Sequence, residues 1–308
     1  MTLPPTPLES RRYAGAADLP VLLSFAAAST GARWPLDATW HPGNIVWNLK
    51  AAYDTPQALR LWTCGDEAVA AAWFVGPGEL YLEVLPTSED AIPNMLEWAE
   101  AASRRQSAPA LSVRALENDT PRIHLLESLG YRRAGVETVC FRKALSSPTS
   151  QPSLPPGATA LDCTDIDIEA RAACHRDAWS ALDHIGIQGA RSSFSAEVYR
   201  SLRAAALYDP RLDVVIQAPD GRLASNCICW ADQSSGVGLF EPVGTGADYR
   251  GQGYGRAAVL EGLRRLKTAG LRWARVGTAH FNAPAIATYL SCGFELIDRT
   301  SWWAKPLT

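Results

Sequence analysis

The sequence lacks long apolar runs and any large excess of one charge. No stretch approaches about 18 uninterrupted apolar residues, so we expect no segment that spans a membrane. A net charge of −3 gives no broad positive field, so we expect neither nucleic acid nor a membrane surface as a partner. Residues 1–7 also lack a basic region followed by an apolar stretch, which predicts no signal peptide and a cytoplasmic location.

Paired metal-binding motifs are absent from the sequence as well. The seven cysteines are scattered without the short paired spacings of a zinc site, and the five histidines form no His-x-x-x-His pair. Cys227 and Cys229 lie two positions apart in an apolar strand pattern, where packing in a core explains them more simply than metal binding does. We predict reduced, mostly buried thiols and no metal site.

The chain has enough length and apolar content for two domains. Its 308 residues are 47% apolar and 20% charged, which is typical of globular proteins. Proline and serine displace every periodic pattern at residues 146–157, which predicts an extended linker. We therefore expect a first domain at residues 1–145 and a second domain at residues 158–308.

Periodic patterns in the second domain predict a mixed α/β sheet. Helical spacing at residues 165–182 and 194–206 precedes strand patterns at residues 212–217, 223–231 and 237–245. A glycine-rich turn follows, then a helix at residues 256–268, a strand at 272–278, a helix at 283–292 and a strand at 300–305. The strands before and after the first of these helices are predicted to be parallel, because a helical crossover joins them, whereas the earlier strands form antiparallel pairs.

The first domain repeats part of this order. Strand patterns at residues 59–62, 68–75 and 79–85 precede a helix at 91–104 and a strand at 110–114. Residues 118–131 then resemble residues 282–294 with one extra residue, since each segment begins with Asn, continues as a helix and ends with Gly and an aromatic residue. This similarity predicts two copies of one fold.

A turn with three glycines at alternate positions marks the change from strand to helix in the second domain. Its residues are Arg250, Gly251, Gln252, Gly253, Tyr254, Gly255 and Arg256. Glycine leaves the backbone open to a ligand, and the backbone N–H groups at the start of a helix favour a diphosphate. The spacing is neither that of a dinucleotide-binding fingerprint nor that of a nucleoside-triphosphate loop.

Three segments together resemble the GNAT superfamily of N-acetyltransferases. They are residues 241–245, the Arg-x-x-Gly-x-Gly turn, and the pattern Asn282-x-x-Ala285-x-x-x-Tyr289-x-x-x-Gly293-Phe294. The resemblance covers about residues 158–307 and implies a mixed, mostly antiparallel sheet flanked by helices. It also implies that the strand at residues 237–245 splays from its parallel neighbour to make a slot for acetyl-CoA, the co-substrate.

The resemblance assigns residues to each part of acetyl-CoA. Val243 and Thr245 would offer backbone hydrogen bonds to the pantetheine arm, and Asn282 would contact the arm from the other wall. The pyrophosphate would bind to the turn, for which we assign Arg250, Gly251, Gln252, Gly253, Tyr254, Gly255 and Arg256.

Amide formation from a thioester needs a proton acceptor for the amine and a proton donor for the leaving thiolate. Tyr289 matches the family position for the donor, and a phenol with a reference pKa near 10 is protonated at neutral pH. Glu241, on the strand beside the slot, is the candidate base, with a structural role or acceptor contact as the alternative, because the family's acidic residue can stand where this sequence has Leu239. His280 is a second candidate base.

The acceptor pocket is expected at the first two helices of the second domain and the segment between them. Trp179, His184 and Trp230 are candidate lining residues, although aromatic residues of a small domain more often belong to the core.

The first domain departs from the pattern at two places. Residues 86–90 hold two carboxylates and no glycine turn, and the position that matches Tyr289 is Leu125 or Leu126, depending on the alignment. Neither leucine can donate a proton, so we predict a degenerate copy without cofactor binding.

The leading hypothesis is therefore an enzyme that transfers an acetyl group from acetyl-CoA to a primary amine of a small molecule. Tandem organisation at this length resembles the mycothiol synthase family, whose substrate is one candidate acceptor. The alternatives are acetylation of a protein or peptide amine and a non-catalytic acyl-CoA-binding module. A monomer and a homodimer are equally compatible with the sequence.

Overall fold

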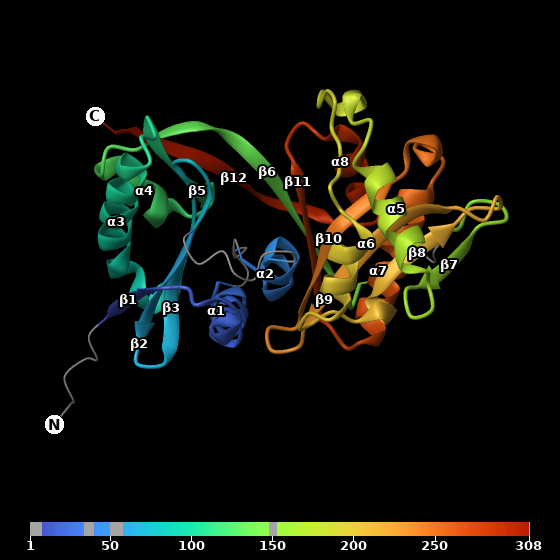
Figure 1. Cartoon of the computed structure of the whole chain (residues 1–308), viewed down its shortest axis with the longest axis horizontal. Helices are drawn as coiled ribbons and strands as arrows, with labels where there is room; N and C mark the ends of the chain where they lie inside the picture. The colour runs from blue at the N-terminus through green and yellow to red at the C-terminus, as the bar shows by residue number, and fades with distance from the viewer. Residues whose placement is uncertain (1–7, 34–39, 50–57, 148–152, 308) are drawn as a thin grey trace. The chain divides into compact units, whose positions relative to one another are not determined.

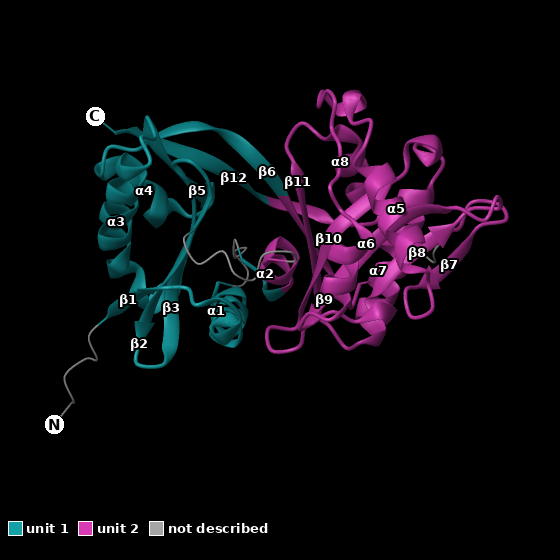
Figure 2. Ribbon diagram, in the orientation of Figure 1, with its two compact units in different colours: residues 1–42, 52–139, 298–308 teal, residues 43–51, 140–297 magenta. Residues whose placement is uncertain are grey.

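The computed structural model describes residues 8–33, 40–49, 58–147 and 153–307 (Figure 1). The chain divides into two compact units, which Figure 2 colours separately. Unit 1 comprises residues 1–42, 52–139 and 298–308, and unit 2 comprises residues 43–51 and 140–297. Part of the predicted linker, residues 148–152, lies outside the described residues.

The two units do not follow the predicted division of the chain at residues 145 and 158. Except for its first residue, the helix α2 (Pro42–Leu49) belongs to unit 2 although it lies in the first sixth of the sequence. The strands β6 (Arg132–Ala144) and β12 (Glu295–Pro306) each belong in part to both units. The end of β12 pairs with unit 1 from Thr300 to Pro306, so the last strand of the chain completes the sheet of the first unit. No local pattern predicted this exchange, because strand partners are chosen by packing.

Unit 1 is a mixed sheet in the order β1-β2-β3-β4-β5-β12-β6. All of these pairs whose register is known are antiparallel except β4 with β5. α3 buries Ile92, Met95, Leu96 and Ala99, the spacing of one helix face, against the core. The elements are β1 (Glu9–Arg12), α1 (Leu19–Ala32), β2 (Leu59–Cys64), β3 (Glu67–Gly76), β4 (Glu79–Val84), α3 (Ile92–Arg105), β5 (Ala110–Leu116) and α4 (Thr120–Ser128).

Unit 2 repeats this plan with the order β6-β11-β10-β9-β8-β7. The strands β10 and β11 are parallel, and β7 to β10 are antiparallel neighbours. Its elements are β7 (Thr159–Asp162), α5 (Ile168–Ala178), α6 (Ala196–Arg203), β8 (Asp213–Gln217), β9 (Leu223–Asp232), β10 (Val237–Thr245), α7 (Tyr254–Thr268), β11 (Trp273–Ala279) and α8 (Ala283–Ser291).

α5 and α7 cover opposite faces of the unit 2 sheet. Asn226 of β9 donates to the Cys174 sulfur of α5 at 3.3 Å, whereas its neighbour Cys227 donates to Ala258 O of α7 at 3.3 Å. Successive strand side chains point to opposite faces, so these two contacts place the helices on different sides. α7 buries Val259, Leu260, Leu263 and Leu266, which have the spacing of one helix face.

The predicted fold class, two mixed α/β copies with a parallel strand pair in each, is confirmed. The helix and strand ranges predicted in both halves match the observed elements to within a few residues at most ends. β1, α1, α2, β6 and β7 were not predicted individually. No helix in the described part of the chain is long and apolar enough to cross a membrane.

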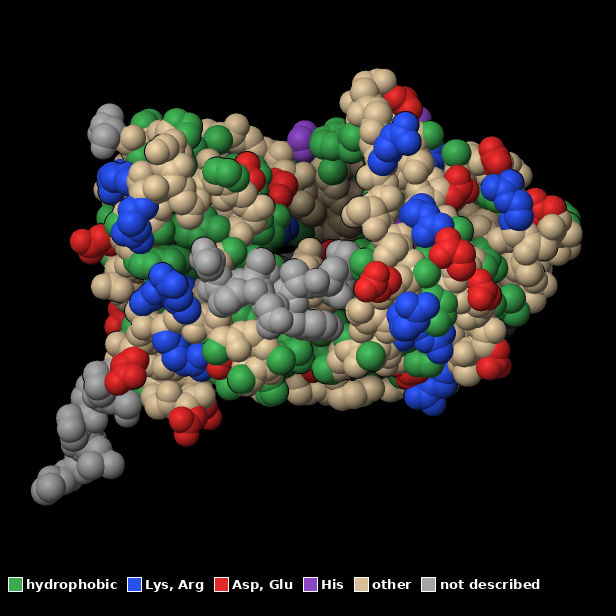
Figure 3. Space-filling model, in the orientation of Figure 1, with side chains coloured by type: hydrophobic (Ala, Val, Ile, Leu, Met, Phe, Trp, Pro, Cys, Tyr) green, Lys and Arg blue, Asp and Glu red, His purple; other side chains and the backbone are tan. Residues whose placement is uncertain are grey.

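Charged side chains of both signs are interspersed on the face of unit 2 that Figure 3 shows. This distribution agrees with the small net charge and offers no single-sign patch there for a polyanion. Within the described ranges, no group of three His, Cys, Asp or Glu residues is arranged to hold a metal ion.

Candidate active site

The parallel strands of unit 2 separate halfway along their length. β10 pairs with β11 from Val237 to Phe240, and the register recorded between them in the described residues ends there. On its other edge β10 continues to pair with β9 as far as Thr245. Val243, Gly244 and Thr245 are half-buried. Beyond Phe240, no register between these residues and β11 is recorded in the described part of the chain, and the Thr245 carbonyl accepts a hydrogen bond from Arg250 Nε at 3.3 Å.

The glycine turn leaves the start of α7 open. Gly251 and Gly253 have φ of +72° and +90°, and a Cβ at Gly251 would meet nothing within 4 Å. Gly253 is the N-cap of α7 and provides no side-chain hydrogen bond to the helix N–H groups. At Gly255 a Cβ would lie 2.7 Å from the Thr245 hydroxyl, so a side chain has no room there. The turn thus offers exposed backbone donors at the positive end of a 15-residue helix.

Arg250 and Gln252, which we assigned to the pyrophosphate, already bond to the protein. The Arg250 guanidinium donates to Ala181 O at 2.7 Å and to Ala178 O and Ser180 O at 3.1 Å. These carbonyls end α5 and follow it, so Arg250 caps the negative end of that helix. The Gln252 amide donates to Asp248 O at 2.7 Å. Both side chains therefore hold the turn in place.

The other two side chains of the turn differ in exposure. Tyr254 is buried and its ring packs against Tyr249 at 5.3 Å, while Arg256 is half-buried near the start of α7. The turn has two cationic side chains, Arg250 and Arg256. Arg250 bonds to carbonyl groups, and for Arg256 the structure records no ion pair among the described residues.

Tyr289 lies on α8 in an apolar setting. It is 4% exposed, and its ring packs against Phe141 of β6 at 5.8 Å and Phe294 at 6.1 Å. Burial, with smaller contributions from Cys227, Cys292 and Glu241, raises the pKa of Tyr289 well above its ordinary value. The phenol is therefore protonated at neutral pH and able to donate.

Glu241 lies on β10 just after the last residue paired with β11. Its backbone carbonyl accepts a hydrogen bond from the Trp230 indole Nε1 at 2.5 Å, and its side-chain carboxylate accepts one from the Asn44 amide of α2. The side chain is half-buried. Leu239, the other position for an acidic residue, is 4% exposed and belongs to the core.

Asn44 is a site residue that the sequence analysis missed. It lies 197 positions from Glu241, on a helix whose eight residues carried no motif. No local signal links the two, and only the docking of α2 on unit 2 brings them together.

Asn282 is the N-cap of α8. Its side-chain oxygen accepts a hydrogen bond from Ala285 N at 3.3 Å, and its amide donates to the Thr278 hydroxyl at 3.2 Å. In unit 1, Asp119 caps α4 with nearly the same backbone angles, φ −82° and ψ 68° against −83° and 70°. The structural counterpart of Asn282 is thus Asp119 and not Asn118. The extra residue in the predicted alignment disappears, and Leu126 becomes the counterpart of Tyr289.

The candidate acceptor residues have different surroundings. Trp230 is fully buried, so it belongs to the core. Trp179 stacks on His175 at 4.2 Å and lies against Gly244 of β10. His184 is exposed, with Nδ1 3.2 Å from the Arg250 guanidinium, and His280 is exposed with Phe281 edge-on at 5.3 Å.

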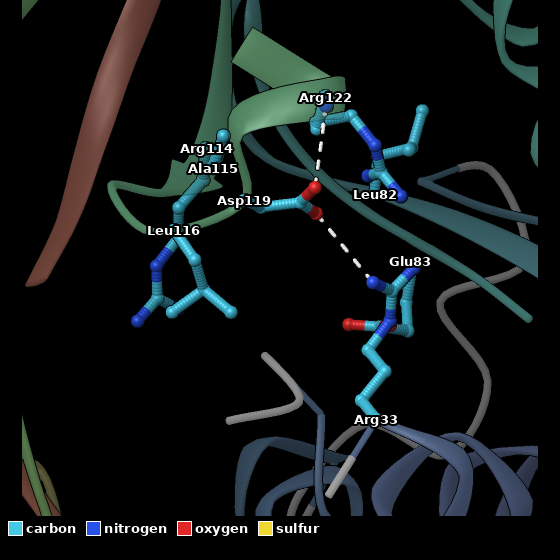
Figure 4. A pocket seen from close by; sticks show the side chains of 8 residues that line it. All are labelled: Arg33, Leu82, Glu83, Arg114, Ala115, Leu116, Asp119 and Arg122. Atoms are coloured by element: carbon cyan, nitrogen blue, oxygen red, sulfur yellow. Dashed lines mark hydrogen bonds and ion pairs between the residues drawn. The ribbon is translucent and has the colours of Figure 1, made fainter. Parts of the chain in front are cut away.

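The corresponding slot in unit 1 is filled by a side chain. β4 and β5 pair only at Glu79–Leu80 with Ser112–Val113 before they separate. The Arg33 guanidinium occupies the region beyond, where it donates to Val84 O at 2.7 Å and to Glu83 at 2.9 Å. Figure 4 shows the small cavity that remains, with Arg33, Asp119 and Arg122 pointing into it.

Comparison with known proteins identifies related sequences. Residues 179–294 match the model of the Acetyltransferase (GNAT) family. Mycothiol acetyltransferase from Nocardiopsis dassonvillei is 36% identical over 108 residues, which are 32% of each chain. Mycothiol acetyltransferase from Thermobifida fusca is 34% identical over 99 residues, 29% of this chain and 30% of that protein. The matches thus span about a third of the length of these relatives.

Two solved structures are similar over nearly the whole chain. A GCN5-related N-acetyltransferase from Sphaerobacter thermophilus aligns with a TM-score of 0.62 and 21% identity, covering 99% of this chain and 97% of the other. A tandem GNAT protein from the clavulanic acid biosynthesis pathway aligns with a TM-score of 0.66 and 18% identity, covering 98% and 99%. At these identities the likeness concerns the fold.

Proposed function

We propose that this tandem GNAT-fold protein, whose residues 179–294 form an acetyltransferase domain of the GNAT family, transfers the acetyl group of acetyl-CoA to a primary amine of a small molecule. The single observation that carries the proposal is the separation of β10 from β11 beside the uncapped start of α7. A free strand edge and a free helix N-terminus, side by side, suit a ligand with an amide-containing arm and a diphosphate. The mycothiol acetyltransferases support a small thiol-containing amine as one acceptor to test.

The residues present fit acetyl-CoA, which would supply the activated thioester. Gly251 and Gly253 leave open the space that a Cβ would fill, and the N–H groups of α7 are free of a side-chain cap. The half-buried backbone of Val243 and Thr245 would pair with the pantetheine amides. Arg256 would add a positive charge near the pyrophosphate. Asn282, which caps α8, would present its amide from the opposite wall.

Glu241 and Tyr289 would carry the two proton transfers. The Glu241 carboxylate accepts a proton from the incoming ammonium, directly or through a water, which leaves the amine free to attack the carbonyl carbon. A C–N bond then forms as the C–S bond breaks, and the second proton that the nitrogen must lose restores the Tyr289 phenol after that phenol has protonated the sulfur. Tyr289 donates its phenolic proton to the leaving sulfur, a task for which its raised pKa keeps it protonated.

The first test of this proposal is calorimetric titration of acetyl-CoA into the wild type and into Gly253→Asp. Gly270→Asp is the matched control, because Gly270 also has a positive φ, +84°, and open space around its Cβ position, at the other end of α7. We expect micromolar binding in the wild type and the control, and loss of binding in Gly253→Asp, where a carboxylate faces the pyrophosphate site.

Thiol release across a panel of small amines and amino-terminal peptides then identifies the acceptor class. Release with a small amine supports the proposal, and release with peptides alone points to protein acetylation. Binding without release for any amine points to a non-catalytic acyl-CoA-binding module. Equal acetyl-CoA affinity in wild type and Gly253→Asp would mean that the glycine turn is not the cofactor site.

A further inference from the structure

The helix α2 is anchored on unit 2 by buried apolar contacts. Ile45, Val46 and Leu49 are each at most 2% exposed. Trp47 packs against the His175 ring of α5 at 5.5 Å and against Phe194 at 5.6 Å. α2 therefore covers the α5 side of the unit 2 sheet, where the acceptor was predicted to bind. Its attachment depends on unit 2 residues, although its sequence lies in the first half of the chain.

A glycine at the start of α2, Gly43, determines how closely the helix backbone approaches Trp230. A Cβ at Gly43 would collide with the side chain of Trp230, so only glycine lets the helix backbone approach this closely. Trp230 in turn holds the Glu241 backbone carbonyl through its indole N–H at 2.5 Å. The approach of α2 and the position of Glu241 are thus fixed by the same buried tryptophan.

We propose that Asn44 is a positioning residue whose amide N–H group holds the Glu241 carboxylate in its ionised form and in one orientation, so that α2 completes the active site of unit 2. The inference rests on the proposed role of Glu241 as proton acceptor. A hydrogen bond donated to a carboxylate favours the charged form and restricts its rotation. Asn44 is neutral, so it supplies this hydrogen bond without a positive charge. A cation at this position would form an ion pair with the Glu241 carboxylate and keep it from accepting a proton.

Charged and titratable groups also lie on the elements around Glu241. They are Tyr289 of α8, whose pKa the Glu241 charge helps to raise, His175 of α5, which stacks on Trp179, and Arg275 of β11, which is in register with Leu239. Beyond β11 lies the exposed His280, and α7 carries Glu261, paired with Arg264 and Arg265.

The experiment compares Asn44→Ala and Asn44→Asp with wild type in the full chain. Asn48→Ala is the matched control: Asn48 lies one turn further along α2, is exposed, and donates only to the Asn44 backbone carbonyl, at 2.8 Å. The titration midpoint of Glu241 is read by carbon-13 NMR of labelled glutamate and assigned by its loss in Glu241→Gln. The second readout is the acid limb of the pH profile of kcat/KM for thiol release.

We expect the Glu241 midpoint and the acid limb to rise together by about one pH unit in Asn44→Ala, the size of one hydrogen bond to a charged group. Asn44→Asp is nearly isosteric and adds a like charge, so it should shift both further. Acetyl-CoA affinity should stay within about twofold in all variants, and Asn48→Ala should match wild type.

An unchanged Glu241 midpoint in both Asn44 variants would overturn the proposal. The wild type could fail to release thiol with every amine of the panel while the Glu241 midpoint still moves in the Asn44 variants. That outcome would support the hydrogen-bond role of Asn44 and would contradict the proposed function. A kcat/KM loss of equal size at every pH, without a midpoint shift, would mean that Asn44 is merely structural.

Discussion

The two units place the same feature, a parallel strand pair that separates, in opposite surroundings. In unit 2 the free edge of β10 is half-buried and is followed by three glycines. In unit 1 the region beyond the β4–β5 pairing holds Arg33, whose guanidinium bonds to the carbonyl of Val84 (Figure 4). The fold thus provides the slot in both copies, and the side chains around it decide whether a cofactor has access.

Electrostatics stabilises the filled state in unit 1. Burial disfavours the Arg33 charge, but Glu83, Asp119 and Glu89 outweigh that effect and raise the pKa of Arg33. Two carboxylates, Glu89 and Asp90, also stand where unit 2 has its glycine turn. A pyrophosphate would meet repulsion there and would have to displace an internally paired arginine. The predicted loss of cofactor binding in unit 1 would therefore need no change of fold.

The largest expected effect concerns the proposed proton donor Tyr289, whose counterpart in unit 1 is Leu126. Tyr289→Phe should lower kcat about 10²- to 10⁴-fold, the usual contribution of a general acid, while acetyl-CoA affinity is kept. Tyr249→Phe is the control, because that phenol donates to Asp220 at 2.6 Å on the hairpin between β8 and β9. Unchanged turnover in Tyr289→Phe would mean that Tyr289 is not the proton donor. Tyr289 would then not differ in function from its unit 1 counterpart, Leu126.

The next effect concerns the residue that fills the unit 1 slot. Arg33→Ala leaves three carboxylates around a vacated buried site and should lower the free energy of unfolding by about 3–5 kcal/mol in urea. Arg104→Ala, at an ion pair with Glu100 whose arginine is 48% exposed, should cost at most about 1 kcal/mol. A cost in Arg33→Ala no greater than that of the control would show that Arg33 is not what closes the slot.

Alkaline pH should distinguish the units, because among the residues that the structure describes unit 2 holds more buried phenols than unit 1. Burial and the Asp213 carboxylate raise the pKa of Tyr199 and Tyr208 above the unfolded value of about 10. The native state then retains protons that the unfolded state loses, so this contribution is complete below pH 10 and declines as pH rises. The slope is about 1.4 kcal/mol per pH unit for each phenol.

Urea unfolding between pH 9 and pH 11 tests this effect. The double variant Tyr199→Phe, Tyr208→Phe should flatten the decline relative to wild type, and Tyr131→Phe, the corresponding single change in unit 1, should flatten it less. Equal slopes in all three proteins would contradict the assignment of the decline to buried phenols.

The smallest effect concerns the helix cap that the two units share. Asn282→Ala should cost about 1 kcal/mol of stability through loss of the cap on α8. Asn282→Asp keeps the accepting oxygen and should be nearly neutral in stability, but it loses the amide. A raised KM for acetyl-CoA in Asn282→Asp would support contact with the pantetheine arm, and an unchanged KM would leave Asn282 with the same capping role as Asp119.

Elements with local signals were predictable from the sequence. The strand at residues 237–245 coincides with β10, and Leu263 and Leu266 mark the buried face of α7. Serine is a favoured helix cap, and the Ser195 side chain accepts a hydrogen bond from Val198 N at 3.2 Å at the start of α6. The repeat at α4 and α8 was found, but the sequence left two alignments open, and the structure agrees with the one that pairs Leu126 with Tyr289, because Asp119 and not Asn118 caps α4.

The sequence by itself determined the periodic elements, the glycine turn and the leucine that the first copy has at the position of Tyr289, since each depends on residues within one or two helical turns. Tertiary structure alone decided that α2 brings Asn44 to Glu241, that Arg33 fills the unit 1 slot, that Arg250 bonds to the end of α5, and that β12 completes unit 1. These contacts join segments far apart in the chain. They follow from which buried surfaces pack together, and no local window of sequence specifies that choice.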